Sequence, residues 1–178
     1  MKTAWIGMML LCCAGAYVQA QPVDRDTILG FGDIHIGMSF PEVDQLLRSS
    51  GVFRYRGEAD VSLSPGRERV VMEVEGFDYI RRGIFQFIDD QLFSITLILS
   101  QSTMDHFTLF TRFTERYGEP EQFGPRRIVW EDGQRRLTLE RPLTVQYLDL
   151  IQFTERRDQG RAQESLRELS RELFLEQF

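Results

Sequence analysis

The chain has 178 residues, of which 42% are hydrophobic and 27% are charged, and this composition predicts one globular domain or two small ones while excluding a disordered chain. Aromatic residues make up 12% of the chain and include 14 Phe, enough to build a sizeable core. The formal net charge of -6 at pH 7 argues against non-specific attraction to nucleic acid or to an anionic membrane surface.

The first twenty residues have the pattern of a signal peptide. Lys2 gives a positive start, an uncharged apolar run follows from Ala4 to Ala16, and Val18-Gln19-Ala20 fits the site that signal peptidase reads. We therefore expect residues 1–20 to be removed and the protein to be periplasmic or secreted. The alternative is a membrane-tethered lipoprotein that carries its lipid on Cys13, at the end of a relaxed lipobox.

A helix is predicted after a lead-in loop at residues 21–30. Ser39 and Glu42 have the S-x-x-E spacing of a capping box, and Pro41 falls in the first turn, where its missing N–H costs nothing. Gly51 ends this helix after about three turns. Its predicted buried face consists of Val43, Leu46 and Leu47.

The next part of the chain predicts short strands at 52–55, 61–63 and 70–74, and then a hairpin. The arms of this hairpin, 84–87 and 92–99, flank the acidic turn Asp89-Asp90-Gln91. Alternation in the second arm predicts a central strand that is covered on both faces. One face would hold Phe93, Ile95, Leu97 and Leu99, and the other Leu92 and Ile98.

A second helix is predicted to open at Ser102 or Thr103 and to stop at Gly118. A hairpin at 128–139 follows, with the turn Glu131-Asp132-Gly133. The predicted buried face of the helix consists of Phe107, Phe110, Phe113 and Tyr117. In the last predicted strand, alternate side chains face the same side of the sheet. They are Leu143, Val145, Tyr147, Ile151 and Phe153, with Asp149 as a polar exception.

This order of elements predicts an α+β fold over residues 31–154, an antiparallel sheet with helices packed on one face. The likeness between "IFQFIDDQLFSITL" and "IVWEDGQRRLTL", each a hairpin with an acidic turn, indicates two diverged helix-plus-sheet units. Residues 155–178 predict a C-terminal amphipathic helix, with a break at Asp158-Gln159-Gly160 before it. The helix either packs on the sheet or projects to bind a partner. Its apolar stripe consists of Leu166, Leu169, Leu173, Phe174, Leu175 and Phe178, and all of these except Leu175 are the candidate partner-binding residues.

The segment "IHIGMSFPEVDQLL", residues 34–47, resembles the opening of small envelope proteins with the β-lactamase-inhibitor-like fold, including the SmpA/OmlA outer-membrane lipoproteins. The shared features are an apolar pair, Gly37-Met38-Ser39, and a helix start with Val43 and Leu46-Leu47. The resemblance implies a helix-plus-antiparallel-sheet module that binds other proteins and catalyses nothing. It implies no particular binding residues in this chain.

No catalytic, cofactor or metal motif emerges from the sequence. Both cysteines, Cys12 and Cys13, lie in the targeting segment, and no phosphate-binding glycine loop is present. His35 is expected at the surface, and His106 is expected to be solvated or locally hydrogen-bonded. Asp149 is expected in a salt bridge or at a strand end. The acidic pairs at 89–90 and 131–132 are explained by turn geometry. The arginine pairs at 81–82, 126–127 and 135–136 form either a solvated rim or a surface for an anionic partner.

We therefore expect an exported, non-catalytic protein-binding or envelope-assembly module without a cofactor. It would bind another envelope or periplasmic protein through its sheet face or its C-terminal helix, and no nucleic acid. No transmembrane segment is expected after signal cleavage. The alternative is a carrier of lipids or other hydrophobic small molecules, with a Phe-rich cavity between helices and sheet. A hydrolase that uses Asp149 or a histidine is the third class of function.

Overall fold

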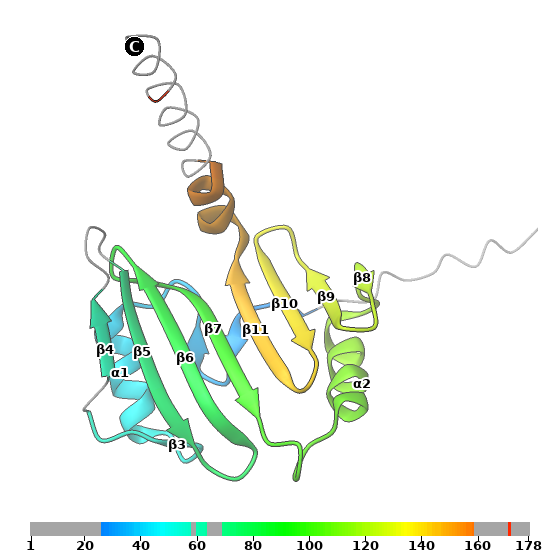
Figure 1. The fold of residues 1–178 in the computed structure, drawn as a ribbon, viewed down its shortest axis with the longest axis horizontal. Helices are drawn as coiled ribbons and strands as arrows, with labels where there is room; N and C mark the ends of the chain where they lie inside the picture. Colours follow the sequence, from blue (N-terminus) through cyan, green and yellow to red (C-terminus); the bar gives the residue numbers. More distant parts are fainter. Residues whose placement is uncertain (1–25, 58–59, 64–68, 159–170, 172–178) are drawn as a thin grey trace, which may run out of the picture.

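The computed structural model describes residues 26–57, 60–63, 69–158 and 171. It is an α+β structure with a large antiparallel sheet and three helices (Figure 1). The helices are α1 (Phe40–Ser49), α2 (His106–Tyr117) and a C-terminal helix that begins at residue 150 and is described as far as residue 158. The strands are β1 (Gly30–Phe31), β2 (Ile34–His35), β3 (Phe53–Arg54), β4 (Asp60–Leu63), β5 (Arg69–Gly76), β6 (Ile80–Ile88), β7 (Gln91–Leu99), β8 (Gln122–Phe123), β9 (Arg127–Glu131), β10 (Arg135–Glu140) and β11 (Thr144–Asp149).

The predicted fold class is confirmed by the strand order. The main sheet has nine strands in the order β3-β5-β6-β7-β11-β10-β9-β8, with β4 also paired to β5, while β1 and β2 form a separate hairpin. Every neighbouring pair is antiparallel. None of the helices in the described ranges is both long and apolar enough to cross a membrane.

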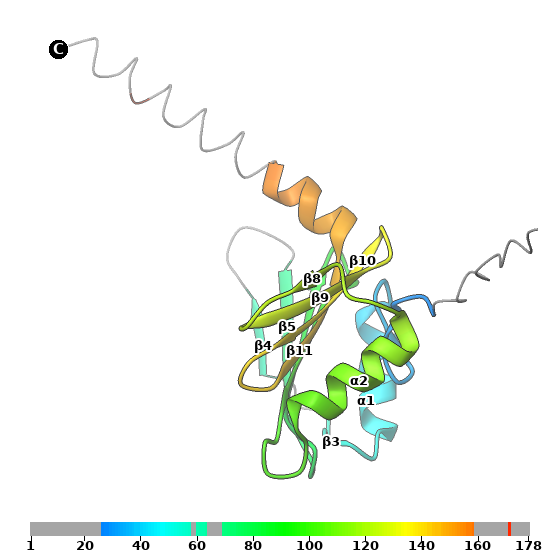
Figure 2. The same cartoon turned by 90° about the vertical axis from the view of Figure 1, so that its right-hand side faces the viewer.

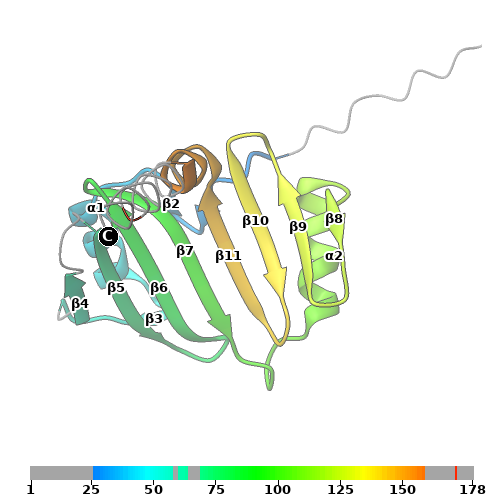
Figure 3. The same cartoon turned by 45° about the horizontal axis from the view of Figure 1, so that its top comes forward.

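The sheet consists of two halves that meet at its centre (Figure 3). α1 precedes the half that runs from β3 to β7, and α2 precedes the half that runs from β8 to β11. The halves join through β7 and β11, where Ile98 pairs with Thr144 and Ser94 with Leu148. Two helix-plus-sheet units are therefore present. The two similar hairpins are nevertheless not equivalent in them, because β6–β7 lies next to the central seam and β9–β10 does not.

The main core lies between the sheet and the two helices. Figure 2 shows α1 and α2 on the same side of the sheet. Val43 and Leu47 of α1 are fully buried in this core, as predicted, and Leu46 packs against it. The sheet contributes large buried side chains such as Phe85 and Trp130. Burying these apolar surfaces supplies the main stabilising free energy of the domain.

The first turns of α1 and α2 are set by carboxylates. The Glu42 carboxylate accepts hydrogen bonds from Ser39 N at 2.8 Å and from Ser39 Oγ at 2.7 Å, which lowers the pKa of Glu42. In α2 the cap is Asp105, whose carboxylate accepts from Thr108 N at 2.9 Å and Thr108 Oγ1 at 2.6 Å. The predicted start at Ser102 or Thr103 is wrong, because it is the Asp105 side chain that accepts the hydrogen bond from the first-turn amide of Thr108.

The buried face of α2 also differs from the prediction at one position. Phe107 is 73% exposed, so its place on the buried face was predicted wrongly. Leu109 instead packs against the core, together with Phe110 and Phe113, and Tyr117 is buried. The helix ends at Gly118, as predicted.

A β-bulge changes which side chains of β7 face the core. Ser94 pairs with Gln86, but Leu92 pairs with Phe87, so Phe93 is an extra residue on β7. Leu92 therefore joins Ile95 in the main core, whereas Phe93 lies in a second cluster with Ile88 and Leu148. The predicted grouping of Phe93 with Ile95 is wrong because strict alternation does not continue through a bulge.

The predicted cover on both faces of β7 is confirmed in part, because Phe93 and Ser94 are buried on the second face with Leu148. The strand is central in the sheet, as predicted. However, α1 and α2 pack on the same face (Figure 2), and over the described ranges neither helix covers the other face. Half-buried Thr96 and Ile98 lie on that second face.

The end of β11 starts the C-terminal helix. Asp149 Oδ1 accepts hydrogen bonds from Ile151 N at 2.9 Å and Gln152 N at 3.0 Å, so it caps the helix that begins at residue 150. Asp149 is thus at a strand end, as expected. Ile151 and Phe153 are exposed on the helix, so their predicted inward orientation on a strand is wrong. The helix also begins upstream of the predicted residue 155.

Several predicted features lie outside the described residues. They are the signal peptide at 1–20, the lipid site at Cys13, and the apolar stripe at Leu166, Leu169, Leu173, Phe174, Leu175 and Phe178.

Candidate functional site

The face of the sheet opposite α1 and α2 is the main candidate site, and we call it the open face. Its central residues alternate with core residues along each strand and are joined across strands by the register. One row runs from Ile84 through Thr96 and Gln146 to Thr138. The uncharged residues that form this neutral centre are half-buried Ile84, Gln86, Thr96, Ile98, Thr144 and Gln146, together with buried Ser94 and Thr138.

Ion pairs border the neutral centre on both sides. Arg82 lies 2.8 Å from Glu73 on the side of β5 and β6, and Arg136 lies 2.7 Å from Glu131 on the side of β9 and β10. The register places Glu73 and Arg136 on the same face as the neutral centre, beside Ile84 and Leu148 respectively. An uncharged centre within a charged rim is the arrangement that protein interfaces share.

Hydroxyl and amide groups supply the polarity of the neutral centre. Gln146 Nε2 donates a hydrogen bond to Thr96 Oγ1 at 3.4 Å across the seam between β7 and β11. Ser94 is only 2% exposed, and its Oγ has no hydrogen-bond partner among the described residues. Ser94 is therefore out of reach of a partner, whereas the half-buried Thr96 and Gln146 can exchange hydrogen bonds with one without the high desolvation cost of a buried charge.

The acidic residues predicted in turns have structural roles. Asp132 accepts hydrogen bonds from Gln134 N at 3.0 Å and Arg135 N at 2.7 Å, and it also binds Ile28 N at 3.0 Å. The turn interpretation is therefore confirmed, and the same carboxylate fixes the lead-in segment to the sheet.

The other acidic turn also binds neighbouring elements. Asp90 accepts from Phe40 N at 3.2 Å, and Asp89 lies 3.1 Å from the guanidinium of Arg156 in the C-terminal helix. Both aspartates have the positive φ that short acidic side chains tolerate in turns. Across the described ranges, no group of three or more His, Cys, Asp and Glu side chains is placed to hold a metal ion.

A titratable cluster connects α1 to the loop after β3. Tyr55 donates a hydrogen bond to Asp44, and Arg48 Nε lies 2.7 Å from the same carboxylate. The hydrogen bond from Arg48 lowers the pKa of Asp44, while burial raises the pKa of Tyr55 to about 12. The three groups satisfy one another, and a structural role accounts for all of them.

The two histidines lie in separate elements. His35 is in β2, half-buried, with its Nε2 3.1 Å from Gly32 O. His106 is the first residue of α2, and its Nε2 is buried without a hydrogen-bond partner in the described part of the chain. The residue as a whole is half-buried, so the expected solvated or locally bonded state fails only at Nε2. Burial lowers the pKa of His106, and the charge of Arg141 lowers it further.

We expect His106 to make the stability of the domain depend on pH. Its pKa is lower in the folded protein than in the unfolded chain, so its contribution to stability is complete above the unfolded value of about 6.5 and is lost as the pH falls below that value. The free energy of unfolding should therefore decrease from about pH 7 to about pH 5.5, and the decrease should be smaller in His106→Gln.

Urea denaturation at both pH values measures this effect, and His35→Gln controls for the loss of a histidine elsewhere. Equal losses of stability in His106→Gln and in the unsubstituted protein would show that His106 does not cause the dependence.

Comparison with known proteins gives a single kind of match. The model of the TP0088 domain family matches residues 29–159. Searches of curated proteins and of solved structures both return no match. The matched range begins just before β1 and extends beyond the start of the C-terminal helix, so it includes the whole sheet and both α1 and α2. Because this match covers most of the sequence, the chain belongs to the TP0088 domain family.

Proposed function

We propose that this protein is an exported, non-catalytic module that binds another envelope or periplasmic protein through the open face of its sheet. The neutral centre within a charged rim is the observation that supports the proposal, because it matches the organisation of protein interfaces. The C-terminal helix would contribute a second contact surface, with Ile151 and Phe153 exposed where it begins.

The rigidity of the open face favours this function. Its side chains stand on central strands whose backbone hydrogen bonds are made within the sheet, so a partner would not have to order a loop on binding. The ring contacts on the opposite face fill the space between α2 and the sheet. Trp130 lies 6.2 Å from Phe110 and 5.7 Å from Phe113, ring centre to ring centre. This packing favours protein binding over the alternative of a carrier for hydrophobic small molecules.

Site-specific photocrosslinking in cells tests the proposal. A photoreactive amino acid at Thr96 would report on the neutral centre, and one at the exposed Arg112 on α2 would be the matched control. We expect one defined protein to be crosslinked from Thr96 and not from Arg112. Equal products from both positions, or no product from Thr96, would overturn the proposal.

Truncation after Arg157 separates the two surfaces. If the open face is the main interface, the Thr96 product should persist in the truncated protein with reduced yield at most. Complete loss of that product, with the circular dichroism spectrum of the domain unchanged, would show that binding depends on the C-terminal helix and not on the open face.

A further inference from the structure

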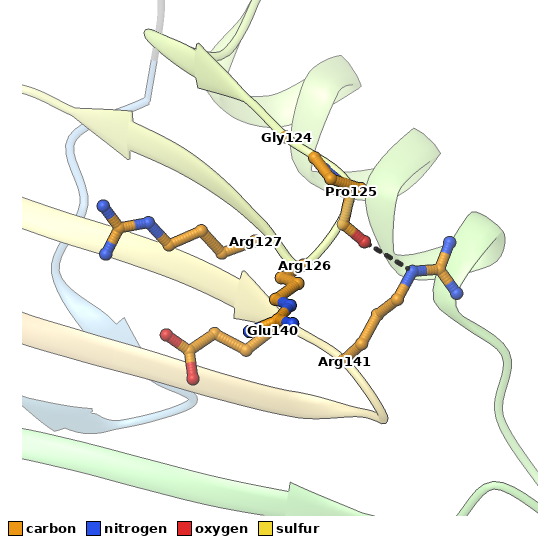
Figure 4. Close-up of a pocket in the computed structure, with 6 residues that line it drawn as sticks. All are labelled: Gly124, Pro125, Arg126, Arg127, Glu140 and Arg141. Carbon is orange, nitrogen blue, oxygen red and sulfur yellow. Dashed lines mark hydrogen bonds between the residues drawn. The ribbon is translucent and has the colours of Figure 1, made fainter.

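A hollow of about 580 Å³ lies where the loop between β8 and β9 meets the loop between β10 and β11. Figure 4 shows its lining side chains and the hydrogen bond that Arg141 Nε donates to Pro125 O at 3.1 Å. A second bond, from Arg141 N to Arg126 O at 2.9 Å, holds the two loops together. We call the exposed residues Arg126, Arg127 and Arg141 the arginine corner.

The arginine corner differs from Arg82 and Arg136, which border the neutral centre, in its lack of ion pairs. Arg82 and Arg136 each lie within 2.8 Å of a carboxylate. Within the ranges that the structure describes, no carboxylate lies within 4.0 Å of the charged groups of Arg126, Arg127 or Arg141. Glu140 lines the same hollow without pairing with them. Three unpaired guanidinium groups in a chain of net charge -6 form a local positive surface.

The spread of these side chains indicates the shape of an acidic ligand. In Figure 4 the side chains of Arg127 and Arg141 extend in opposite directions, with Arg126 between them. One small anion would not contact both ends of this arrangement. An extended segment with several carboxylates could pair with the guanidinium groups one after another, with the paired hydrogen bonds that arginine and carboxylate form.

The register places this corner at the rim of the open face. Across the strands, Arg127 lies opposite Glu140, Glu140 lies opposite Thr144, and Thr144 lies opposite Ile98 of the neutral centre. We propose that the arginine corner binds an acidic segment of the protein that docks on the open face. This inference rests on the proposed function and specifies the chemistry of the partner beside the neutral centre.

Binding of a defined peptide tests the charge preference. The probe is a fluorescein-labelled peptide of alternating glutamate and serine, titrated with the full chain and followed by fluorescence anisotropy. We expect the double variant Arg126→Gln/Arg127→Gln to weaken binding by about tenfold, because close charge pairs dominate such contacts. The control Arg56→Gln/Arg81→Gln removes the same charge from exposed positions outside the corner and should change binding by less than about twofold. Arg141 is retained because it braces the loops.

Three results would overturn the inference. They are equal weakening in both double variants, full displacement of the peptide by inorganic phosphate at a similar concentration, and binding to phosphatidylglycerol vesicles in place of the peptide. Weak binding that disappears at physiological salt in all variants would also count against it, since it would report only general charge attraction.

The crosslink from Thr96 distinguishes this inference from the proposed function. If Arg126→Gln/Arg127→Gln leaves both the Thr96 product and the affinity for the captured partner unchanged, the arginine corner has no role while the open face retains its own. If the peptide binds as expected but Thr96 gives no product, the proposed function fails and the corner is an acid-binding site outside an interface.

Discussion

Trp130→Ala is expected to lower the free energy of unfolding by about 3–5 kcal/mol, as is usual when a large buried aromatic side chain is truncated. Trp130 is 1% exposed and forms the centre of the packing between α2 and the second half of the sheet. Its indole Nε1 also donates a hydrogen bond to Gly118 O at 2.9 Å, at the end of α2. The substitution therefore leaves a cavity and an unpaired carbonyl at once.

Urea denaturation followed by far-ultraviolet circular dichroism measures the effect, since the substitution removes the main fluorescent group of the domain. Trp130→Phe is the matched variant, because it keeps an aromatic ring in place and loses the indole N–H. It should cost about 1–3 kcal/mol, less than the alanine variant. A loss below about 1 kcal/mol in Trp130→Ala would contradict the described packing of α2 on the sheet.

Gly76→Ala is expected to destabilise the domain by about 1–3 kcal/mol, the usual cost of forcing extra atoms into a packed site. A Cβ at Gly76 would lie 2.2 Å from the carbonyl oxygen of Ile80, across the turn between β5 and β6. Backbone cannot move aside as a flexible side chain can, so the hairpin itself would have to shift. Gly76 also pairs with Phe53 of β3, and the shift would disturb the edge of the sheet.

Gly51→Ala is the control for this prediction. No heavy atom lies within 4 Å of a Cβ added at Gly51, so the same chemical change should alter the unfolding midpoint little. Thermal melts of both variants, with the unsubstituted protein beside them, measure the difference. A similar midpoint for Gly76→Ala and Gly51→Ala would show that the turn relaxes without cost.

Local signals in the sequence predicted the helix starts and turns well where one side chain decides the structure. The capping box of Ser39 and Glu42 is one example, because its atoms come from residues three positions apart. At α2 several residues competed for the same role. Ser102, Thr103 and Asp105 are all residue types that cap helices well, and in the structure Asp105 accepts the first-turn hydrogen bond from Thr108 N.

Features set by contacts distant in the sequence could not be predicted in the same way. The bulge at Phe93 arises from the pairing of β7 with β6, and alternation within β7 carries no sign of it. The polar side chains of Thr96, Gln146 and Thr138 were visible in the sequence. However, their assembly into one surface depends on the pairing of β7 with β11 and of β11 with β10. The open face is therefore a product of strand order, which periodicity does not encode.

The central seam between the two halves also has a consequence for the order of folding. Within each half, strands that follow one another in the sequence pair with short connections, so the loops to be closed are small. The pairing of Ile98 with Thr144 closes a far longer loop that contains α2 and three strands. Contacts between distant parts of a chain form slowly, because their loop-closure entropy must be overcome first. The two halves should therefore form their own hairpins early, and the joining of β7 to β11 should complete both the sheet and the surface that it carries.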